Sequence, residues 1–242
     1  RLDDQSQGLH LAFGHLLADA TQRANLRADV VGSLLYVANW RFVFSDQAYA
    51  GLFDSPSPVL HFWSLAIEEQ FYLLYPLVVF GALSVLHWSR KRFGVLVIVL
   101  AIVSASIPFF IPMSDDRIYF GTDTRAAELL LGVLAAVWLA RWPLGRPVLS
   151  RPAGRAVSAV GIVAVVVTVA CWVLLDQGSA VLYRGGFLAY GLASAALVVS
   201  ASVVGTPLAR ALGVAPLREL GRISYGVDLD HWPVFVVVSP ER

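Results

Sequence analysis

The sequence is poor in charged residues and almost devoid of cysteine. Asp, Glu, Lys and Arg make up 14% of its 242 residues, whereas 57% are hydrophobic and the mean hydropathy is +0.69. Soluble domains carry about 25% charged residues, so this composition excludes an ordinary soluble protein and predicts a membrane protein. The single cysteine, Cys171, cannot form a disulfide within the chain and lies in an apolar run, where we interpret it as a packing residue.

Several motifs with well-defined chemistry are also missing. The sequence has no phosphate-binding glycine loop, no zinc-type spacing of cysteine and histidine, and no nucleophile elbow. The net charge of +1 says little about partners, and nothing in the sequence suggests binding to nucleic acid. We therefore expect no metal site, no cofactor and no nucleic-acid partner.

Six apolar segments have the character of membrane helices. A helix needs roughly 20 apolar residues to cross the hydrocarbon core of a bilayer. Four segments are confident spans bounded by charge, proline or glycine, the fifth is rich in small residues, and the sixth reaches the end of the sequence. In order, the segments are 64–86, 93–111, 126–142, 156–175, 186–204 and 223–239. The sequence predicts an all-α fold, a polytopic transmembrane helix bundle with about five to six spans.

The start of the sequence does not contain a confident span. Residues 1–23 include an apolar patch that is too short, and it is interrupted by His10 and His15, so it reads as an interfacial helix or part of a transmembrane one. The chain begins with arginine and its one methionine is Met113, so we expect a piece of a longer protein. We expect a partial N-terminal segment at 1–33 and one membrane domain at 34–242, truncated at both ends.

The arginines and lysines indicate the orientation. Alternate loops hold ten of them, and the intervening loops hold four, so by the positive-inside rule the first set is cytoplasmic. We therefore expect loops 41–61, 112–125 and 176–185 to face outward. The ten are Arg90, Lys91, Arg92, Arg141, Arg146, Arg151, Arg155, Arg210, Arg218 and Arg222; the four are Arg41, Arg117, Arg125 and Arg184.

The stretch HFWSLAIEEQFYLLYPLVVF, residues 61–80, places two adjacent carboxylates in the first predicted span. In a helix, His61, Ser64 and Glu68 share one stripe, and Glu69 points about a third of a turn away, toward Tyr72. Placing a charged side chain in a membrane helix costs free energy, so ionisable residues there indicate either a functional site or a polar contact between helices. We favour an acid–base or substrate-anchoring cluster in an outward-opening cavity; a buried hydrogen-bonded network that joins helices is the alternative.

A second cluster lies in DDRIYFGTDTRAAELLLG, residues 115–132. Thr122 or Asp123 is a plausible N-cap for the following helix. The guanidinium of Arg125 carries its N–H donors in a planar fork, and we expect it to hold a phosphate, carboxylate or sugar hydroxyl. Because Arg125 and Glu128 are three residues apart, a local ion pair is the alternative.

A third cluster, in GRISYGVDLDHWPVF at residues 221–235, contains Asp228, Asp230 and His231 before the last apolar run. We expect Pro233 to kink or delay that helix. A binding role for this cluster and a helix end poorly suited to the membrane are equally open.

Four segments together resemble acyltransferase family 3, multi-spanning bacterial enzymes that acylate sugars, surface polysaccharides and lipids. The segments occur in the family's order, and the resemblance extends over most of the chain from about residue 26. They are LLYVANWRFV (34–43), SPSPVLHFWSLAIEEQFYLLYPL (55–77), YFGTDTRAAELLLG (119–132) and LGRISYGVDLDHWPVF (220–235).

The resemblance implies an O-acyltransferase of the bacterial inner membrane, with several spans, that uses cytoplasmic acyl-CoA as donor and a hydroxyl of a sugar, surface polysaccharide or lipid as acceptor. The acyl group then has to cross the bilayer, in contact with membrane lipids. The implied catalytic residues are His61, Glu68 and Glu69. The implied substrate-binding residues are Trp63, Ser64, Tyr72, Asp123, Arg125 and His231.

The chain departs from the family at two places. The family's first membrane helix carries a histidine that follows an arginine with ten residues between them, and the resemblance implies that this histidine is the catalytic base. No arginine here has a histidine at that distance, and His10 and His15 do not match the motif. In the last motif, Asp228 and Asp230 stand where the family has aromatic residues. Two alternatives to an active enzyme stay open: a transporter of a sugar or lipid, and a non-catalytic remnant of the acyltransferase.

Overall fold

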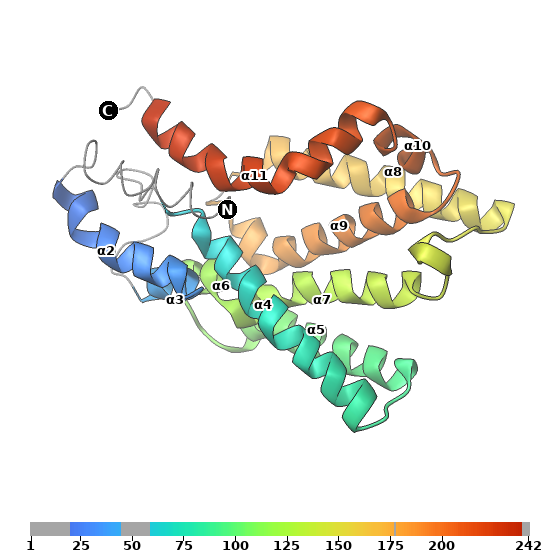
Figure 1. Ribbon diagram of the computed structural model, residues 1–242, viewed down its shortest axis with the longest axis horizontal. Coiled ribbons are helices and arrows are strands. Elements are labelled where there is room, and N and C mark those ends of the chain that lie inside the picture. Colours follow the sequence, from blue (N-terminus) through green and yellow to red (C-terminus); the bar gives the residue numbers. More distant parts are fainter. Residues whose placement is uncertain (1–19, 45–58, 177, 239–242) are drawn as a thin grey trace. The chain divides into compact units, whose positions relative to one another are not determined.

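The computed structural model describes residues 20–44, 59–176 and 178–238, and all regular structure within these ranges is helical (Figure 1). The prediction of an all-α protein is confirmed. In chain order the α-helices are α2 (Ala20–Leu34), α3 (Ala38–Val43), α4 (Phe62–Phe80), α5 (Arg90–Phe110), α6 (Asp115–Phe120), α7 (Thr122–Leu139), α8 (Arg151–Leu174), α9 (Phe187–Ser202), α10 (Pro207–Leu212) and α11 (Ala215–Val238).

Four helical segments are long and apolar enough to cross a membrane. They are Phe62–Val85, Arg90–Phe110, Arg151–Leu174 and Leu182–Ser202, and they coincide with four of the predicted spans. The first and last of them include π-helical turns, at Gly81–Val85 and Leu182–Gly186. The prediction of a transmembrane helix bundle is therefore confirmed, and the count of five to six spans is close.

The other two predicted spans are also helical but carry more charge. Helix α7 has Asp123, Arg125 and Glu128 in its first two turns. Helix α11 begins at Ala215, before the predicted start of the span, and continues through Pro233. The expected delay of this helix at Pro233 is therefore wrong. A proline removes one backbone hydrogen bond from a helix, and membrane helices tolerate this loss where other groups satisfy the freed carbonyl.

The chain forms two compact units. Unit 1 contains the described part of residues 1–76, the short segment Phe120–Thr122 and the described chain from Glu219. Unit 2 contains Leu77–Tyr119 and Asp123–Arg218. The signature helix α4 therefore starts in unit 1, and helices α5, α8, α9 and α10 belong to unit 2.

In unit 1, helices α2 and α3 form a tight hairpin. A Cβ added at Gly32 would stand 3.5 Å from the Cα of Ala38, which is ordinary van der Waals contact, so the two helices pack against each other here. Arg41 of α3 forms a 2.7 Å ion pair with Asp29 of α2, and Asp29 is buried. This packing and the ion pair fix α3, and with it the first of the four family-like segments, against α2.

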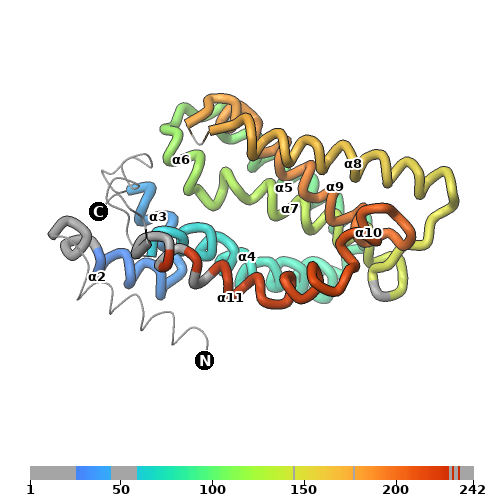
Figure 2. The backbone as a smooth tube through the Cα atoms, turned by 90° about the horizontal axis from the view of Figure 1, so that it is seen from above, coloured from blue at the N-terminus to red at the C-terminus, as the bar shows by residue number. Residues whose placement is uncertain are grey.

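In unit 2, helices α8 and α9 lie side by side in both views (Figures 1 and 2). Gly161 of α8 faces Ser200 of α9, and a Cβ on this glycine would stand 2.2 Å from the serine Oγ. The small residues expected between membrane helices in the fifth predicted span thus allow the two backbones to approach closely. Helix α10, capped by the Thr206 hydroxyl, packs against both α8 and α9.

Large apolar side chains cover the outer surfaces of the spans. Trp172, Val173 and Leu174 at the end of α8 are each at least 70% exposed, and Ile102 and Val103 of α5 are more than half exposed. Continuous apolar surface of this extent does not occur on water-facing proteins and is what lipid contact requires. The exposed surface therefore supports a membrane protein independently of the sequence composition.

Candidate functional site

The N-terminal end of α4 carries most of the predicted site. The helix begins at Phe62, so His61 directly precedes its first turn. The hydroxyl of Ser64 donates a 3.1 Å hydrogen bond to the His61 carbonyl. The Ser64 hydroxyl proton is thus engaged by the backbone carbonyl of His61. This bond closes the first turn of the helix and holds the His61 backbone in place.

Trp63 packs inside unit 1. Its ring meets the ring of Phe120 edge to face, with 5.3 Å between centroids, and Phe120 also packs on Phe42 at 5.6 Å. Phe120 is completely buried. Three of the four family-like segments therefore meet in one aromatic core, and Trp63 holds α4 in place there.

A closed ring of hydrogen bonds lies beside this aromatic core. The Asn39 amide donates to Thr122 Oγ1 at 2.9 Å, the Thr122 hydroxyl donates to Gln70 Oε1 at 2.6 Å, and the Gln70 amide donates to Asn39 Oδ1 at 3.0 Å. The two amide groups donate again, Asn39 to the Phe120 carbonyl at 2.9 Å and Gln70 to the Tyr36 carbonyl at 2.7 Å. Both amides thus use all their N–H groups, which fixes the same three segments rigidly.

The fourth family-like segment joins the site through His231 of α11. Its imidazole meets that of His61 edge to face, with centroids 5.8 Å apart. His231 Nδ1 lies 2.7 Å from the carbonyl of Asp228 and 4.0 Å from that residue's carboxylate. The two histidines and the Asp228 carboxylate therefore form one polar group at this end of unit 1.

The two adjacent glutamates of α4 lie in different surroundings. Glu68 is exposed on the helix surface, and its electrostatic neighbours are the carboxylates of Asp228 and Glu69. Glu69 is half-buried, and Tyr72, one turn further on, is 60% exposed. Protein atoms therefore do not enclose Glu68 or Tyr72, and a substrate that reaches them does so from the surface of unit 1.

The second predicted cluster lies largely in unit 2. Arg117 and Asp123 form a 2.7 Å ion pair. Burial raises the pKa of the Asp123 carboxyl, but the hydrogen bond and charge of Arg117 and nearby backbone N–H groups outweigh it, so the pKa lies below its usual value. Helix α7 already begins at Thr122, so the N-cap expected at Thr122 or Asp123 is wrong, and both residues lie in the first turn of the helix. The negative charge of Asp123 there interacts favourably with the positive end of the helix dipole.

Arg125 is held on three sides. It forms a 3.1 Å ion pair with Glu128, and its guanidinium lies 4.2 Å from the Phe187 ring centroid and 5.6 Å from that of Tyr119. The local ion pair considered as an alternative for Arg125 is therefore present. A cavity of about 30 Å³, room for about one water molecule, adjoins Arg125 and Glu128.

Two residues of the hydrogen-bonded ring are absent from the predicted site. Asn39 and Gln70 each lie in a family-like segment, within VANWRF and EEQFYL, but have no charge. An amide in an apolar run is a signal in itself, because a buried amide requires partners. The sequence could have shown that both need hydrogen bonds, but not that they bond to each other.

No group of three or more His, Cys, Asp and Glu side chains within residues 20–44, 59–176 and 178–238 is placed to hold a metal ion. The polar groups described above are imidazole, carboxylate, amide and hydroxyl groups. Such groups can accept and donate protons and orient a hydroxyl-bearing substrate.

Known proteins resemble the chain over nearly its whole length. Relatives include YrhL of Bacillus subtilis strain 168, 35% identical over 231 residues, and the peptidoglycan O-acetyltransferase OatA of Listeria monocytogenes, 36% identical over 226 residues. The O-acetyltransferase OatA of Staphylococcus aureus is 31% identical over 219 residues. These alignments cover 93%, 89% and 88% of this chain.

The chain spans only about a third of the length of these relatives, 36%, 35% and 35% respectively. No solved structure matches it. The model of the acyltransferase domain matches residues 27–240, which include all four family-like segments. The chain therefore belongs to acyltransferase family 3.

Proposed function

We propose that this chain is the membrane-embedded acyl-transfer part of a longer bacterial enzyme, located in the inner membrane, that acylates a hydroxyl of a cell-surface polysaccharide. The observation that carries the proposal is the meeting of four sequence segments in unit 1. Asn39, Gln70 and Thr122 bond three of them into a ring, and His231 brings the fourth to His61. A connected set of side-chain hydrogen bonds that holds three segments together keeps α4 and its polar side chains in a fixed position, which supports a catalytic role.

The acceptor and the acyl group in this proposal come from the relatives. The Listeria protein is named a peptidoglycan O-acetyltransferase and the Staphylococcus protein an O-acetyltransferase. We therefore propose an acetyl group and a hydroxyl of the peptidoglycan glycan strands. The donor in the proposal is acyl-CoA, a thioester, as the family resemblance implies.

In the proposed reaction, the acceptor O–H loses its proton to the His61 imidazole and its oxygen attacks the acyl carbonyl carbon. The new C–O bond forms as the C–S bond of the thioester breaks, and the departing thiolate takes up the proton as a free thiol. Glu68 and Glu69 orient the acceptor. The neighbouring His231 ring limits how the His61 ring can turn.

Arg125 and Asp123 form a second proposed binding group, which lies within unit 2. Nη1 of Arg125 is buried and has no hydrogen-bond partner among the described residues. A guanidinium offers five N–H groups, so pairing with Glu128 leaves donors for a sugar hydroxyl. Tyr72 is 60% exposed and offers aromatic surface of the kind on which sugar rings stack. Trp63 is half-buried against Phe120, so only the uncovered part of its ring can add to that surface.

Replacing either glutamate by glutamine tests the proposal. Glu68→Gln and Glu69→Gln keep size and lose charge, so we expect acylation to fall by about 100-fold with unchanged abundance in the membrane. The measurement is mass spectrometry of cell-wall glycans from cells that express the full-length protein, with immunoblots for abundance. Glu219→Gln is the matched control, since Glu219 is exposed and pairs only with Arg222 among the described residues. Wild-type acylation in both test variants would refute the assignment.

The donor needs a separate test. Inverted membrane vesicles expose the cytoplasmic face, so labelled acetyl-CoA added outside them should transfer its acetyl group to acceptor in the lumen. Loss of transfer in the Glu69→Gln variant would connect the donor to this site. Normal acylation in cells combined with no transfer in vesicles would show that the donor is a different thioester or ester.

A further inference from the structure

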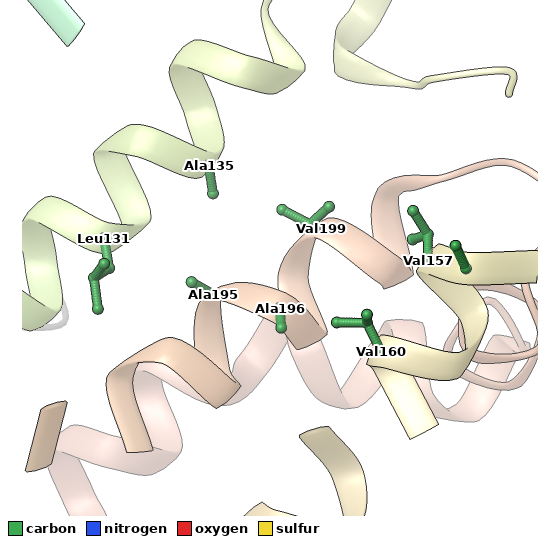
Figure 3. A pocket seen from close by; sticks show the side chains of 8 residues that line it. Leu131, Ala135, Val157, Val160, Ala195, Ala196 and Val199 are labelled. Carbon is green, nitrogen blue, oxygen red and sulfur yellow. The ribbon is translucent and has the colours of Figure 1, made fainter. Parts of the chain in front are cut away.

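An open apolar groove of about 360 Å³ lies between three helices of unit 2. Figure 3 shows Leu131 and Ala135 of α7 directed toward Ala195 and Val199 of α9, with Val157 and Val160 of α8 completing the wall. The volume is more than ten times that of the cavity at Arg125 and lies in the range of about 300 to 1,000 Å³ that is typical of ligand sites.

The lining residues place the groove near one end of the three helices. Ala135 lies one turn before the end of α7, Ala156 lies about one turn after the start of α8, and Val199 lies one turn before the end of α9. The connection between α7 and α8 therefore follows the end of the helix pair at which the groove lies. Its backbone is tied to the end of α9, since the Val204 N–H donates to the Pro147 carbonyl at 3.0 Å.

Two tryptophans mark the membrane boundary at this end. Trp138 and Trp142 pack together with ring centroids 4.7 Å apart, at and just after the last turn of α7. Tryptophan is enriched at the level of lipid headgroups. The groove begins about one turn further along α7 from these rings, toward the middle of the helix, where an exposed apolar surface suits an acyl chain.

Charge at this end is entirely positive. Four arginines, which we call the basic end, lie in the connection and the first turns of α8: Arg141, Arg146, Arg151 and Arg155. All four are exposed, and none forms an ion pair with a described residue. The sequence has no Asp or Glu at all between residues 129 and 175. The basic end therefore lacks a counter-charge from its own segment of chain.

We infer that the groove binds an anionic phospholipid, with one acyl chain against the apolar wall and the phosphate at the basic end. A zwitterionic lipid would also fill the groove, but the ammonium of its headgroup offsets the phosphate charge, so it compensates the arginines less than an anionic lipid does. A basic surface next to an opening between membrane helices is the arrangement that recognises anionic headgroups. None of the residues that line the groove or form the basic end is among those proposed for acyl transfer, so the lipid site can be tested separately.

The test is native mass spectrometry of the full-length protein in mild detergent, titrated with phosphatidylglycerol and, separately, with phosphatidylethanolamine. We expect phosphatidylglycerol to bind more tightly, and Arg141→Gln combined with Arg146→Gln to weaken it by on the order of tenfold. The control, Arg90→Gln with Lys91→Gln, removes two cations from another basic loop predicted to be cytoplasmic. We expect it to leave binding unchanged.

A second variant addresses the apolar wall. Ala196→Leu fills the groove and should displace the lipid without changing charge; if this variant does not fold, the arginine pair decides alone. Equal binding of the two lipids, or phosphatidylglycerol binding that survives the arginine substitutions, would overturn the inference. A change of oligomeric state in either variant, without loss of lipid, would assign the groove to a second copy of the chain and overturn it as well.

Discussion

The Thr122 hydroxyl donates a 2.6 Å hydrogen bond to the side-chain carbonyl of Gln70, a residue 52 positions earlier in the chain. The bond joins the start of α7 to the helix that carries His61, Glu68 and Glu69. Because Asn39 completes the ring, each of the three side chains depends on the other two. Loss of one group therefore leaves unsatisfied partners, and its effect exceeds that of a single surface hydrogen bond.

Thr122→Val removes this hydroxyl and preserves the shape of the side chain. We expect a loss of about 1 to 3 kcal/mol in the free energy of unfolding, because Gln70 Oε1 and an Asn39 N–H lose their partner. The measurement is thermal unfolding of the purified protein in detergent. Ser106→Ala is the control, since the Ser106 hydroxyl is exposed and bonds only within its own helix. Equal melting temperatures for Thr122→Val and the wild type would contradict a structural role for the ring.

Asn39→Asp should be more damaging, because Asn39 is fully buried and donates two hydrogen bonds that a carboxylate cannot donate. A buried charge without a cation costs about 3 to 5 kcal/mol, so we expect little folded protein in the membrane. Asn39→Ala removes the same bonds without adding charge and should lose less. Abundance in isolated membranes and sensitivity to protease give the comparison, and the reverse order of severity would contradict the expected cost of the buried charge.

Gly161→Ala tests the close packing of α8 on α9. The new methyl group would stand 2.2 Å from Ser200 Oγ, so the helices must separate, at a cost of about 1 to 3 kcal/mol. Ser200→Gly removes the obstructing atoms and should restore most of the lost stability when combined with Gly161→Ala. Thermal unfolding of the two single variants and the double variant measures this coupling.

Gly154→Ala is the matched control for that experiment. Gly154 lies on the same helix but has open space where its Cβ would be, so alanine should be neutral or slightly stabilising. A double variant no more stable than Gly161→Ala alone would show that the contact with Ser200 is not the cause of the loss.

Asp123 gives the protein an acid-sensitive contact. Its pKa is lowered in the folded protein, so the ion pair with Arg117 contributes stability that is present above the ordinary carboxyl pKa of 3.8 and is lost as the pH falls through the lower, folded value. We expect the wild type to be more stable than Asp123→Asn at neutral pH by an amount that stays constant down to about pH 4. Below that pH the two melting temperatures should converge. A difference that disappears near pH 6 instead would assign the effect to another group.

Composition and periodicity determined the membrane fold. Runs of apolar residues bounded by charge, proline or glycine place the helices, because helical backbone hydrogen bonds are local and the bilayer demands apolar side chains over a known length. All six predicted segments are helical for this reason. The four family-like segments likewise predicted the family, which the match over residues 27–240 confirms.

Tertiary structure decided which polar groups meet. Nothing in the spacing of residues 39, 70 and 122 indicates a closed ring, because a hydrogen bond between distant residues depends on helix packing and not on sequence distance. The same limit applies to Glu68, whose exposure follows from the face of α4 that its neighbours leave uncovered. The sequence therefore specified the helices and the chemical groups they carry, while the pairing of His61 with His231 and of Gly161 with Ser200 arose only from packing in three dimensions.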